Sequence, residues 1–454
     1  MADFELTVGQ KTVLSEILHT IMKPFDLNDS GRFHTMHGPA GSGKTTVLQQ
    51  IIKQIPAYKT IGLTSPTHKS AKVLRRMARE AGISNRVAIS TIHSALGLVM
   101  KQVRGDEVLV KEPFAEEKIF DVLVVDEAGM LNDELIMYIL ESQSAKIIFV
   151  GDMCQIGPIQ SSVVSDDDNY VPTGEDDVSK VFTEVENMSA LTEVVRQAEG
   201  SPIIQLATQF RIAQEDMYAP LPTIETHTTP EGNGIITMPN GNWVDSAMEK
   251  FKSEEFLNDP DHCRMVCYTN AMVDFCNDLV RKRLFGNDVP EWKVDDIIIA
   301  QEQGMTWKNA DELRIVSIEE HYDNEYEVPC WRVQLESIDD HKLHNAVIVK
   351  GDYLDHYQHR LNAIAERANT DKNMAGMHWK QFWGMRKKFN TFKHIYAITA
   401  HKSQGSTFDY TYVFTPDFYK FGATMSIKRL LYTAITRSRH TTFFAMNSGI
   451  QQRL

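Results

Sequence analysis

The segment HGPAGSGKTT, residues 37–46, is the feature that most narrows what this chain can fold into. Gly38, Gly43, Lys44 and Thr45 fit the pattern G-x-x-x-x-G-K-[ST]. Such a loop holds phosphates because glycines let the backbone approach closely, the following helix presents oriented N–H groups, and the lysine adds positive charge. The pattern predicts strand, phosphate-binding loop and helix, the alternative being a glycine-rich turn. It leaves open what a bound nucleoside triphosphate is used for.

Two carboxylates end a short apolar run, FDVLVVDEA at 120–128. Asp126, at the end of a buried strand, can hold Mg²⁺, and Glu127 can polarise an attacking water molecule. The alternative is a pair of exposed carboxylates at a strand end. A later run ends in FVGDMCQIGPI, where Gln155 is our candidate for a neutral sensor of a γ-phosphate, unless it is an ordinary surface glutamine.

Apolar runs and amphipathic stretches alternate through most of the chain, which predicts buried parallel strands separated by helices, that is, an α/β nucleotide-binding fold. The expected strands include 32–37, 60–66, 120–128 and 145–152, and a second α/β pattern begins near Leu191. Two segments interrupt this rhythm. KQVRGDEVLV predicts a β-hairpin insertion, and consecutive strands over about 293–353 predict a small β-barrel insertion. Near the C-terminus, HWKQFWGMRKKF has the spacing of an amphipathic helix that buries its aromatic side chains.

The formal net charge of −14 is unevenly distributed along the chain. Residues 374–454 carry a net +10, and the preceding residues carry −24. A basic C-terminal segment suits an anionic ligand, although a solvated basic face is equally compatible with these charges. The chain contains no apolar stretch of membrane-spanning length, no apolar leader and only five cysteines, so we expect a cytoplasmic protein in a reducing compartment.

The motifs QKTV, GPAGSGKT, TSPTHKSA, STIHSALG, VVDEAGM, GDMCQIGPI, LTEVVRQ, TAHKSQGSTFD and LLYTAITRSR occur in this order across almost the whole chain. This ordered set resembles the superfamily one DNA helicases, and within them the RecD-like branch. The size and the two insertions resemble a phage-encoded DNA helicase of that branch. The resemblance implies two RecA-like P-loop NTPase domains, a strand-separating hairpin in the first and an SH3-like β-barrel in the second. The implied boundaries are 1–94 with 119–192 for the first domain, 95–118 for the hairpin, 193–292 with 389–454 for the second domain and 293–388 for the barrel with helices.

The resemblance also assigns residues to the nucleotide, with ATP and Mg²⁺ as cofactors. Arg196 and Arg437 match two arginines that contact the γ-phosphate, although either alone could be a surface salt bridge. Gln10 matches an adenine-contacting glutamine, but Thr7 and Gln10 also form a capping-box pattern at a helix start. The implied catalytic set is Lys44, Asp126, Glu127, Gln155, Arg196 and Arg437; Thr45 and Asp126 would hold Mg²⁺; and the nucleotide-binding set is Gln10, Gly38, Pro39, Ala40, Gly41, Ser42, Gly43, Lys44, Thr45, Thr46, Gln404 and Gly405.

A further set matches segments that bind the DNA strand. Small hydroxyls and backbone N–H groups at strand ends suit phosphate contacts, which position a strand without reading its sequence. These residues are Pro66, Thr67, His68, Ser90, Thr91, His93, Pro158, Thr269, Asn270, Thr399, His401 and Ser403. The candidates for the strand-separating wedge are Val108, Leu109, Val110 and Phe114, and Val110 stands where an aromatic residue is expected.

We therefore expect an ATP-dependent DNA helicase that moves 5′ to 3′ on single-stranded DNA and unwinds duplexes in phage replication or recombination. It would bind single-stranded and forked DNA as a monomer, need no membrane, and work beside replication or single-strand-binding proteins. Two alternatives remain at this point. One is a P-loop kinase for a small molecule, and the other is a DNA-binding module whose ATP site is regulatory.

Overall fold

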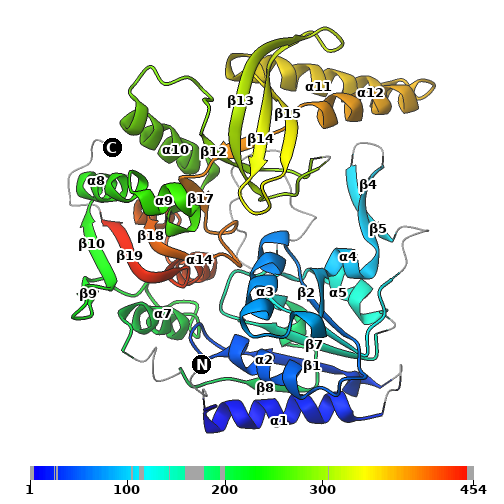
Figure 1. Ribbon diagram of the computed structural model, residues 1–454, viewed down its shortest axis with the longest axis vertical. Coiled ribbons are helices and arrows are strands. Elements are labelled where there is room, and N and C mark those ends of the chain that lie inside the picture. Colours follow the sequence, from blue (N-terminus) through cyan, green and yellow to red (C-terminus); the bar gives the residue numbers. More distant parts are fainter. Residues whose placement is uncertain are drawn as a thin grey trace. The chain divides into compact units, whose positions relative to one another are not determined.

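The computed structural model describes residues 5–24, 26, 29–103, 106–111, 117–142, 144–158, 178–194, 200–304 and 306–446 (Figure 1). The chain divides into two compact units. Unit 1 comprises residues 1–98, 111–276 and 397–454, and unit 2 comprises residues 99–110 and 277–396. Within unit 1 we call the described residues up to 194 the first lobe and those from 200 onward the second lobe.

The first lobe is built on a six-stranded parallel sheet. Its strands, in spatial order, are β3 (Ala88–Thr91), β2 (Ile61–Ser65), β6 (Val122–Val125), β7 (Lys146–Gly151), β1 (Phe33–His37) and β8 (Met188–Ala190). The helices are α1 (Val8–Met22), α2 (Lys44–Gln54), α3 (His68–Glu80), α4 (Ile92–Leu96) and α5 (Asp133–Leu140). The predicted alternation of apolar runs and helices is therefore confirmed in this lobe.

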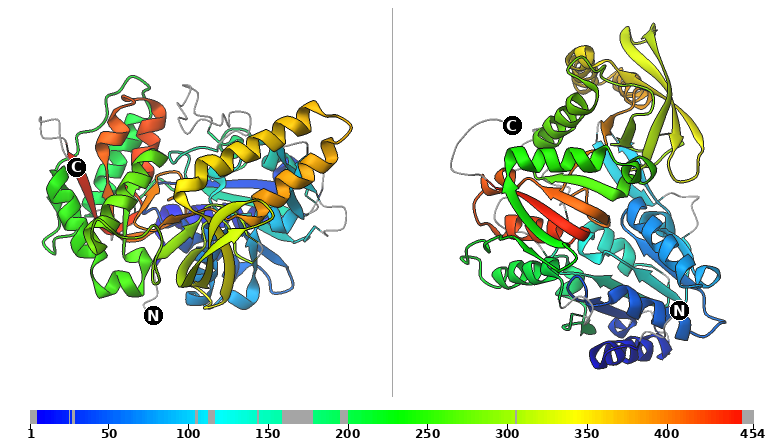
Figure 2. Two further views of the ribbon diagram at one scale, coloured as in Figure 1. Left: turned by 90° about the horizontal axis from the view of Figure 1, so that it is seen from above. Right: turned by 60° about the vertical axis from the view of Figure 1, so that its left-hand side comes forward.

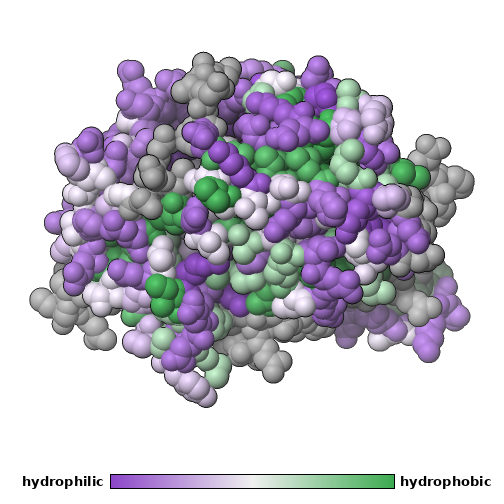
Figure 3. Space-filling view, turned by 90° about the horizontal axis from the view of Figure 1, so that it is seen from below, coloured by the Kyte–Doolittle hydropathy of each residue, from purple (hydrophilic) through white to green (hydrophobic). Residues whose placement is uncertain are grey.

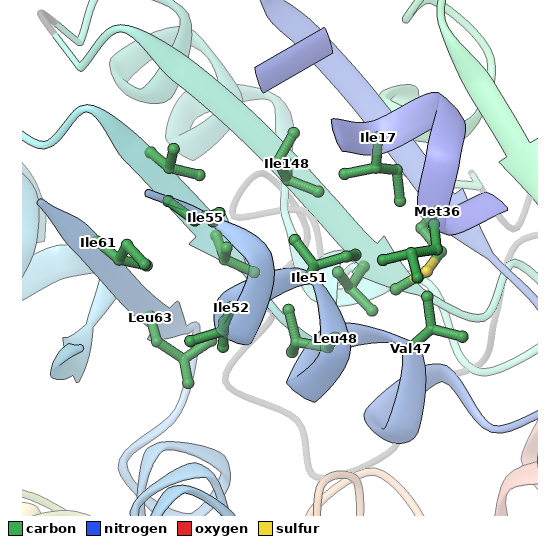
Figure 4. Close-up of a cluster of buried hydrophobic side chains, with 14 of the residues drawn as sticks. Ile17, Met36, Val47, Leu48, Ile51, Ile52, Ile55, Ile61, Leu63 and Ile148 are labelled. Atoms are coloured by element: carbon green, nitrogen blue, oxygen red, sulfur yellow. The ribbon is translucent and has the colours of Figure 1, made fainter. Parts of the chain in front are cut away.

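The core of the first lobe forms where α1, α2 and α3 cover the sheet. From α2, Val47, Leu48, Ile51 and Ile52 point into a buried cluster that also contains Ile148 of β7 (Figure 4). These four residues recur at the three- and four-residue spacing that places side chains on one helix face. Because α2 starts at Lys44, this packing holds the N-terminus of the helix next to the phosphate-binding loop.

The second lobe is built on another six-stranded sheet, parallel except at one edge, where β9 runs antiparallel to β10. Its strands, in spatial order, are β17 (Ala397–Thr399), β11 (Cys263–Cys267), β18 (Phe408–Val413), β19 (Ser438–Met446), β10 (Gly234–Pro239) and β9 (His227–Thr228). The helices are α7 (Pro202–Ala213), α8 (Asn240–Phe251), α9 (Glu254–Asn258), α13 (Thr415–Tyr419) and α14 (Met425–Ile435), and α10 (Asn270–Phe285) begins in this lobe and ends in unit 2.

Unit 2 contains a five-stranded antiparallel sheet and a pair of helices. The strands, in spatial order, are β15 (Leu343–Val349), β14 (Val328–Ser337), β13 (Glu312–Asp323), β12 (Ile297–Ala300) and β16 (Phe392–His394). The helices α11 (Leu354–Thr370) and α12 (Ala375–Lys388) lie side by side (Figures 1 and 2). Trp383 of α12 is buried, as the amphipathic pattern of this segment predicts, whereas Trp379 and Phe382 are only half-buried.

Two further strands, β4 (Leu98–Val103) and β5 (Asp106–Lys111), pair with each other as a two-stranded sheet at the position of the predicted hairpin. No helix in the part of the chain that the structure describes is long and apolar enough to cross a membrane. Hydrophilic and hydrophobic residues are intermingled over the face drawn in Figure 3, as on ordinary protein surfaces.

Candidate nucleotide site

The phosphate-binding loop joins β1 to α2, as its motif predicts. Gly41 and Gly43 both have φ near +80°, a left-handed conformation that side chains with a Cβ rarely adopt. At Gly38 the restriction is close approach, since a Cβ there would lie 2.8 Å from the Leu191 carbonyl oxygen and 2.8 Å from Ser42 Oγ. The glycines are thus required by the backbone conformation of the loop and by its packing.

Hydrogen bonds within the loop hold its lysine in place. Lys44 Nζ donates to the carbonyl oxygens of Gly38 at 2.7 Å and Pro39 at 3.0 Å. Ser42 Oγ donates to the Pro39 carbonyl oxygen at 2.8 Å. The loop therefore presents one cationic side chain and the N-terminal amides of α2 at the same place, which is the combination that binds phosphate.

The carboxylates follow from the strand order of the sheet. Because β6, β7 and β1 are parallel neighbours, Asp126 and Asp152 end up at the same edge as the phosphate-binding loop. Glu127 has φ 54°, an uncommon conformation for a residue with a side chain that often marks functional positions. Desolvation and the neighbouring Glu127 raise the pKa of Asp126 to about 7, although Lys44 opposes this shift.

A desolvated carboxylate beside a second carboxylate suits a divalent cation. Mg²⁺ is bound by oxygen ligands and commonly takes one or two protein ligands together with phosphate oxygens and water. Asp126 and the hydroxyl of Thr45, in the first turn of α2, are such ligands. No group of three or more His, Cys, Asp or Glu side chains suited to a metal exists within the described ranges, so a denser metal centre is absent from them.

The segment after β7 carries Asp152 and Gln155. Asp152 is almost fully buried, with 1% of its side chain exposed, and its Oδ1 accepts a hydrogen bond from the Cys154 N–H at 3.1 Å. The amide oxygen of Gln155 is also buried and has no hydrogen-bond partner among the described residues. A buried acceptor without a partner is costly, so it suits a role in contacting a bound ligand or an ordered water molecule.

The second lobe supplies Arg437, which follows α14. The side chain is only 6% exposed and donates to the Thr433 carbonyl oxygen (3.0 Å), the Ser406 carbonyl oxygen (3.2 Å) and Thr436 Oγ1 (3.0 Å). Burial lowers the pKa of Arg437, and the charge of Glu127 in the first lobe opposes this shift. Arg437 therefore lies close enough to the predicted water-polarising carboxylate of the first lobe to feel its charge, while its own hydrogen bonds stay within the second lobe.

Gln404 and Gly405 lie at this same contact between the lobes. Gln404 Nε2 donates to the carbonyl oxygen of Ile156, two residues before Pro158, at 2.9 Å. Gly405 has φ +70°, and a Cβ on it would lie 2.0 Å from Ser70 Oγ of α3, so no larger residue fits. Both residues thus join the second lobe to segments at the strand ends of the first.

The capping-box role of Gln10 is confirmed, and its side chain also contacts the phosphate-binding loop, while its contact with adenine stays a prediction. Its backbone N–H donates to Thr7 Oγ1 at 3.2 Å, and its Oε1 accepts from the Thr7 N–H at 3.1 Å, which completes the capping box of α1. The Nε2 atom of the same side chain donates to the Ser42 carbonyl oxygen in the phosphate-binding loop at 3.0 Å. The cap therefore orients the amide group against the loop.

The predicted DNA-binding residues gather at the carboxyl ends of two pairs of strands. Ser65 of β2 is paired with Thr91 of β3, so Pro66, Thr67, His68, Ser90, Thr91 and His93 lie near one another. In the second sheet Cys267 of β11 is paired with Thr399 of β17, which brings together Thr269, Asn270, Thr399, His401 and Ser403. The remaining candidate, Pro158, follows the segment that carries Gln155.

Several of these hydroxyls have structural partners. Thr67 accepts from the Ser70 N–H at 3.1 Å as the cap of α3, and Thr91 caps α4 in the same way at 3.3 Å. Thr269 is bonded to Asp417, and the fully buried Ser403 donates to the Ala400 carbonyl oxygen at 2.7 Å. Their side chains shape the strand ends, which leaves backbone groups as the better candidates for phosphate contacts.

Two of the predicted residues, Arg196 and Phe114, lie outside the described residues. Of the other wedge candidates, all on β5, Val108 is 39% exposed, and Leu109 and Val110 are half-buried.

Sequence reasoning missed two residues at the contact between the lobes, Arg211 of α7 and Tyr432 of α14. Both contact Asp152, at 3.3 Å from Arg211 Nη1 and 2.5 Å from the Tyr432 hydroxyl. Tyr432 lies inside the motif LLYTAITRSR, so the sequence identified its motif, but it did not indicate that Asp152 is its partner. Arg211 lies in an ordinary amphipathic helix, and nothing in that pattern distinguishes it from a surface arginine.

Comparisons with known proteins give consistent results for both lobes. The AAA domain family matches residues 6–228, and the UvrD-like helicase C-terminal domain family matches residues 394–444. The chain is 26% identical to the ATP-dependent DNA helicase dda of Enterobacteria phage T4, over 97% of this chain and 99% of that protein. It is 27% identical to the ATP-dependent RecD2 DNA helicase of Deinococcus radiodurans, over 39% of this chain and 21% of that protein. A crystal structure of Pif1 helicase from Bacteroides with ADP-AlF3 and ssDNA aligns with a TM-score of 0.47 and 16% identity, over 97% of this chain and 92% of that one.

The fold and the site define a P-loop nucleotide-binding protein with two lobes built on mainly parallel sheets, which touch beside the phosphate-binding loop. The two family matches and the full-length likeness to a phage helicase make the assignment specific: the chain belongs to the superfamily one helicases. Membership implies ATP and a divalent metal ion as the ligands of this site.

The double role of Gln10 can be separated with two substitutions. Thr7→Ala removes the hydroxyl that accepts from the Gln10 N–H but leaves the bond from Gln10 Nε2 to Ser42 intact, whereas Gln10→Ala keeps that hydroxyl and removes the Nε2 bond together with the bond from the Thr7 N–H to Gln10 Oε1. We expect Thr7→Ala to lose about 1 kcal/mol of stability, the usual effect of losing an N-cap. Only Gln10→Ala should raise the KM for ATP severalfold. Thermal denaturation and steady-state ATPase assays measure the two effects, and an equal KM in both variants would show that Gln10 serves α1 alone.

Proposed function

We propose that this protein is an ATP-dependent DNA helicase that moves 5′ to 3′ on single-stranded DNA and unwinds duplex DNA in phage replication or recombination. The observation that carries the proposal is the contact of the second lobe with the phosphate-binding loop, where the Tyr432 hydroxyl accepts a hydrogen bond from the Ala40 N–H at 3.2 Å, because it makes a second lobe part of the ATP site. A P-loop protein that only bound or phosphorylated a small molecule would not need this arrangement. The full-length likeness to a protein named as an ATP-dependent DNA helicase supports the same conclusion.

We assign the roles of the residues from the resemblance, and the positions of the described ones are compatible with them. Lys44 and the amides at the start of α2 hold the phosphates, and Gln10 contacts the adenine. Asp126 and Thr45 hold Mg²⁺, which supplies positive charge to the phosphates when it is bound. Glu127 polarises the attacking water, Gln155 senses the γ-phosphate, and Arg437 with Arg196 stabilises the charge that develops on the transferred phosphoryl group.

Movement along DNA follows from the division of the catalytic groups between the two lobes. Closing the lobes brings Arg437 to the phosphates, and hydrolysis removes the charge that attracts it. The DNA-binding candidates lie at the ends of β-strands in both sheets. A change in the separation of the lobes therefore shifts the DNA contacts of one lobe relative to those of the other. Contacts to phosphates carry no sequence information, which a translocating protein requires. We infer the 5′ to 3′ direction from the resemblance to the RecD-like branch.

The two insertions are assigned to duplex separation. We propose that residues 95–118, with β4 and β5, act as the strand-separating pin, and that residues 293–388 form an SH3-like β-barrel with two supporting helices. The remaining residues would form two RecA-like domains, 1–94 with 119–192 and 193–292 with 389–454. The exposed Val108 on β5 gives the pin an apolar surface that can pack against the end of a base pair.

Substitution of the phosphate-binding lysine tests the ATPase. Lys44→Ala should reduce DNA-stimulated ATP hydrolysis by about 100-fold or more, because a preorganised cation at the phosphates is lost. Lys53→Ala is the matched control, since Lys53 is an exposed lysine near the end of the same helix. Turnover is measured with and without single-stranded DNA. A native protein that is not stimulated by DNA but turns over a small acceptor would be a kinase instead.

Tailed duplexes test the direction of movement. A duplex with only a 5′ single-stranded overhang should be unwound by the native protein in the presence of ATP and Mg²⁺, and a duplex with only a 3′ overhang should not. Strand separation is followed by gel electrophoresis of labelled DNA. Unwinding from the 3′ overhang alone would contradict the proposed direction while leaving the ATPase assignment intact.

Changes on β5 test the pin. Replacing Val108, Leu109 and Val110 with serine should slow unwinding at least severalfold, because the hairpin loses its apolar surface. ATP hydrolysis on single-stranded DNA should persist, since these residues are not part of the nucleotide site. Ile119→Ser, at another exposed apolar residue of the chain, is the control. Equal unwinding by the native and triple-serine proteins would exclude this strand as the wedge.

A further inference from the structure

A short loop of the first lobe, Asp152 to Ile156, shares five hydrogen bonds with side chains of the second lobe. We call it the Asp152–Ile156 loop. Five side chains of the second lobe contact it: Arg211 donates to Asp152 Oδ1 (3.3 Å), Tyr432 donates to Asp152 Oδ2 (2.5 Å), Gln214 donates to the Cys154 carbonyl oxygen (3.1 Å), Thr433 accepts from the Ile156 N–H (3.3 Å) and Gln404 donates to the Ile156 carbonyl oxygen (2.9 Å). The loop carries Gln155, the predicted γ-phosphate sensor. The second lobe therefore holds the segment that would report on the nucleotide.

Tyr432 connects this loop to the phosphate-binding loop. Its hydroxyl donates to Asp152 and also accepts a hydrogen bond from the backbone N–H of Ala40 at 3.2 Å. Ala40 lies inside the motif GPAGSGKT, whose amides are the groups that cradle phosphate. An amide N–H has one proton to give, so a phosphate oxygen at Ala40 competes with the tyrosine hydroxyl for it. Phosphate binding there must therefore change the position or the partner of Tyr432.

In the contact between Tyr432 and Asp152, the tyrosine hydroxyl is the hydrogen-bond donor and the carboxylate is the acceptor. Burial and the neighbouring Asp152 raise the pKa of Tyr432 well above its ordinary value, so the hydroxyl stays protonated and donates to the carboxylate. Arg211 pairs with the same carboxylate, and together with burial its charge lowers the pKa of His37, the residue before the phosphate-binding loop. Asp152 is thus balanced by two groups of the second lobe, both at the edge of the phosphate site.

A change at Tyr432 would be transmitted to the catalytic arginine. Tyr432 and Thr433 belong to the last turn of α14, and the Thr433 carbonyl oxygen accepts from Nε of Arg437 at 3.0 Å. Thr433 Oγ1 also accepts from the Ile156 N–H. These residues share one short, buried helix end, so they move together when any one of them is displaced.

We propose that Tyr432, Arg211 and Asp152 are positioning residues that couple the state of the phosphate-binding loop to the placement of Arg437 by the second lobe. The inference rests on the proposed helicase function, because coupling is defined here as the increase in ATP turnover that DNA produces. The three residues do not contact the reacting atoms. They determine how strongly ATP binding and hydrolysis change the position of the lobes and, with it, the DNA contacts.

The test removes a single hydroxyl group from Tyr432. Tyr432→Phe should lower the ratio of kcat with DNA to kcat without DNA by about tenfold, the size expected for losing one hydrogen bond to a buried charge. The KM for ATP should change much less than kcat, because Lys44 and the glycines still bind the phosphates. A variant that only weakened the fold would lose activity with and without DNA alike.

Tyr412→Phe is the matched control. Tyr412 is also a fully buried tyrosine of the second lobe, and its hydroxyl bonds to Ser246 at 2.9 Å, away from the contact between the lobes. We expect it to lower the melting temperature about as much as Tyr432→Phe and to leave the DNA stimulation ratio unchanged. Loss of stimulation in both variants, or in neither, would overturn the inference.

A double-mutant cycle tests whether Tyr432 acts through Asp152. If it does, the combination of Tyr432→Phe with Asp152→Ala should be no worse than the more damaging single change, because both remove the same contact. Arg211→Lys should retain more stimulation than Arg211→Gln, since the charge opposite Asp152 is kept. Fully additive effects would contradict the coupling. A native protein without any DNA stimulation would instead refute the proposed function, which distinguishes the two failures.

Discussion

The parallel register of β6, β7 and β1 is the constraint on which the rest of the site depends. It places the carboxyl ends of three strands side by side, so Asp126, Asp152 and the phosphate-binding loop share one edge of the sheet. Two partly or fully buried carboxylates beside a loop that binds anions create strong repulsion unless cations compensate them. The first lobe supplies Lys44, and the second lobe supplies Arg211, which pairs with Asp152 at this edge.

In the proposed function, this need for compensation makes the second lobe part of the ATP site. An arginine that approaches only when two lobes meet would make the electrostatic state of the site depend on their separation, and hydrolysis of the nucleotide would change that state. The Asp152–Ile156 loop adds a second connection, because five side chains of the other lobe hold the segment that carries Gln155. In our proposal, these hydrogen bonds link chemistry at the phosphates to motion of the lobes.

Much of the fold and part of the site could be predicted from local patterns. The α/β alternation, the strand before the phosphate-binding loop and the helix after it follow from apolar periodicity and from glycines at fixed positions, and the structure confirms them. The capping box at Thr7 and Gln10 is also confirmed, since it needs only two residues one helical turn apart. The ordered motifs identified the helicase superfamily. The assignment of Gln10 to adenine, the DNA-binding residues and the domain boundaries remain predictions.

The sequence by itself determined where phosphate would bind, because ten consecutive residues contain both the conformational freedom and the charge that such a loop needs. It could not determine which groups would balance Asp152. Arg211 lies 59 residues away and Tyr432 lies 280 residues away, and each comes from a helix whose pattern reports only that one face is buried. Only the tertiary structure decided those contacts, because they depend on how two separately formed sheets meet, and that is a property of packing over long sequence separations.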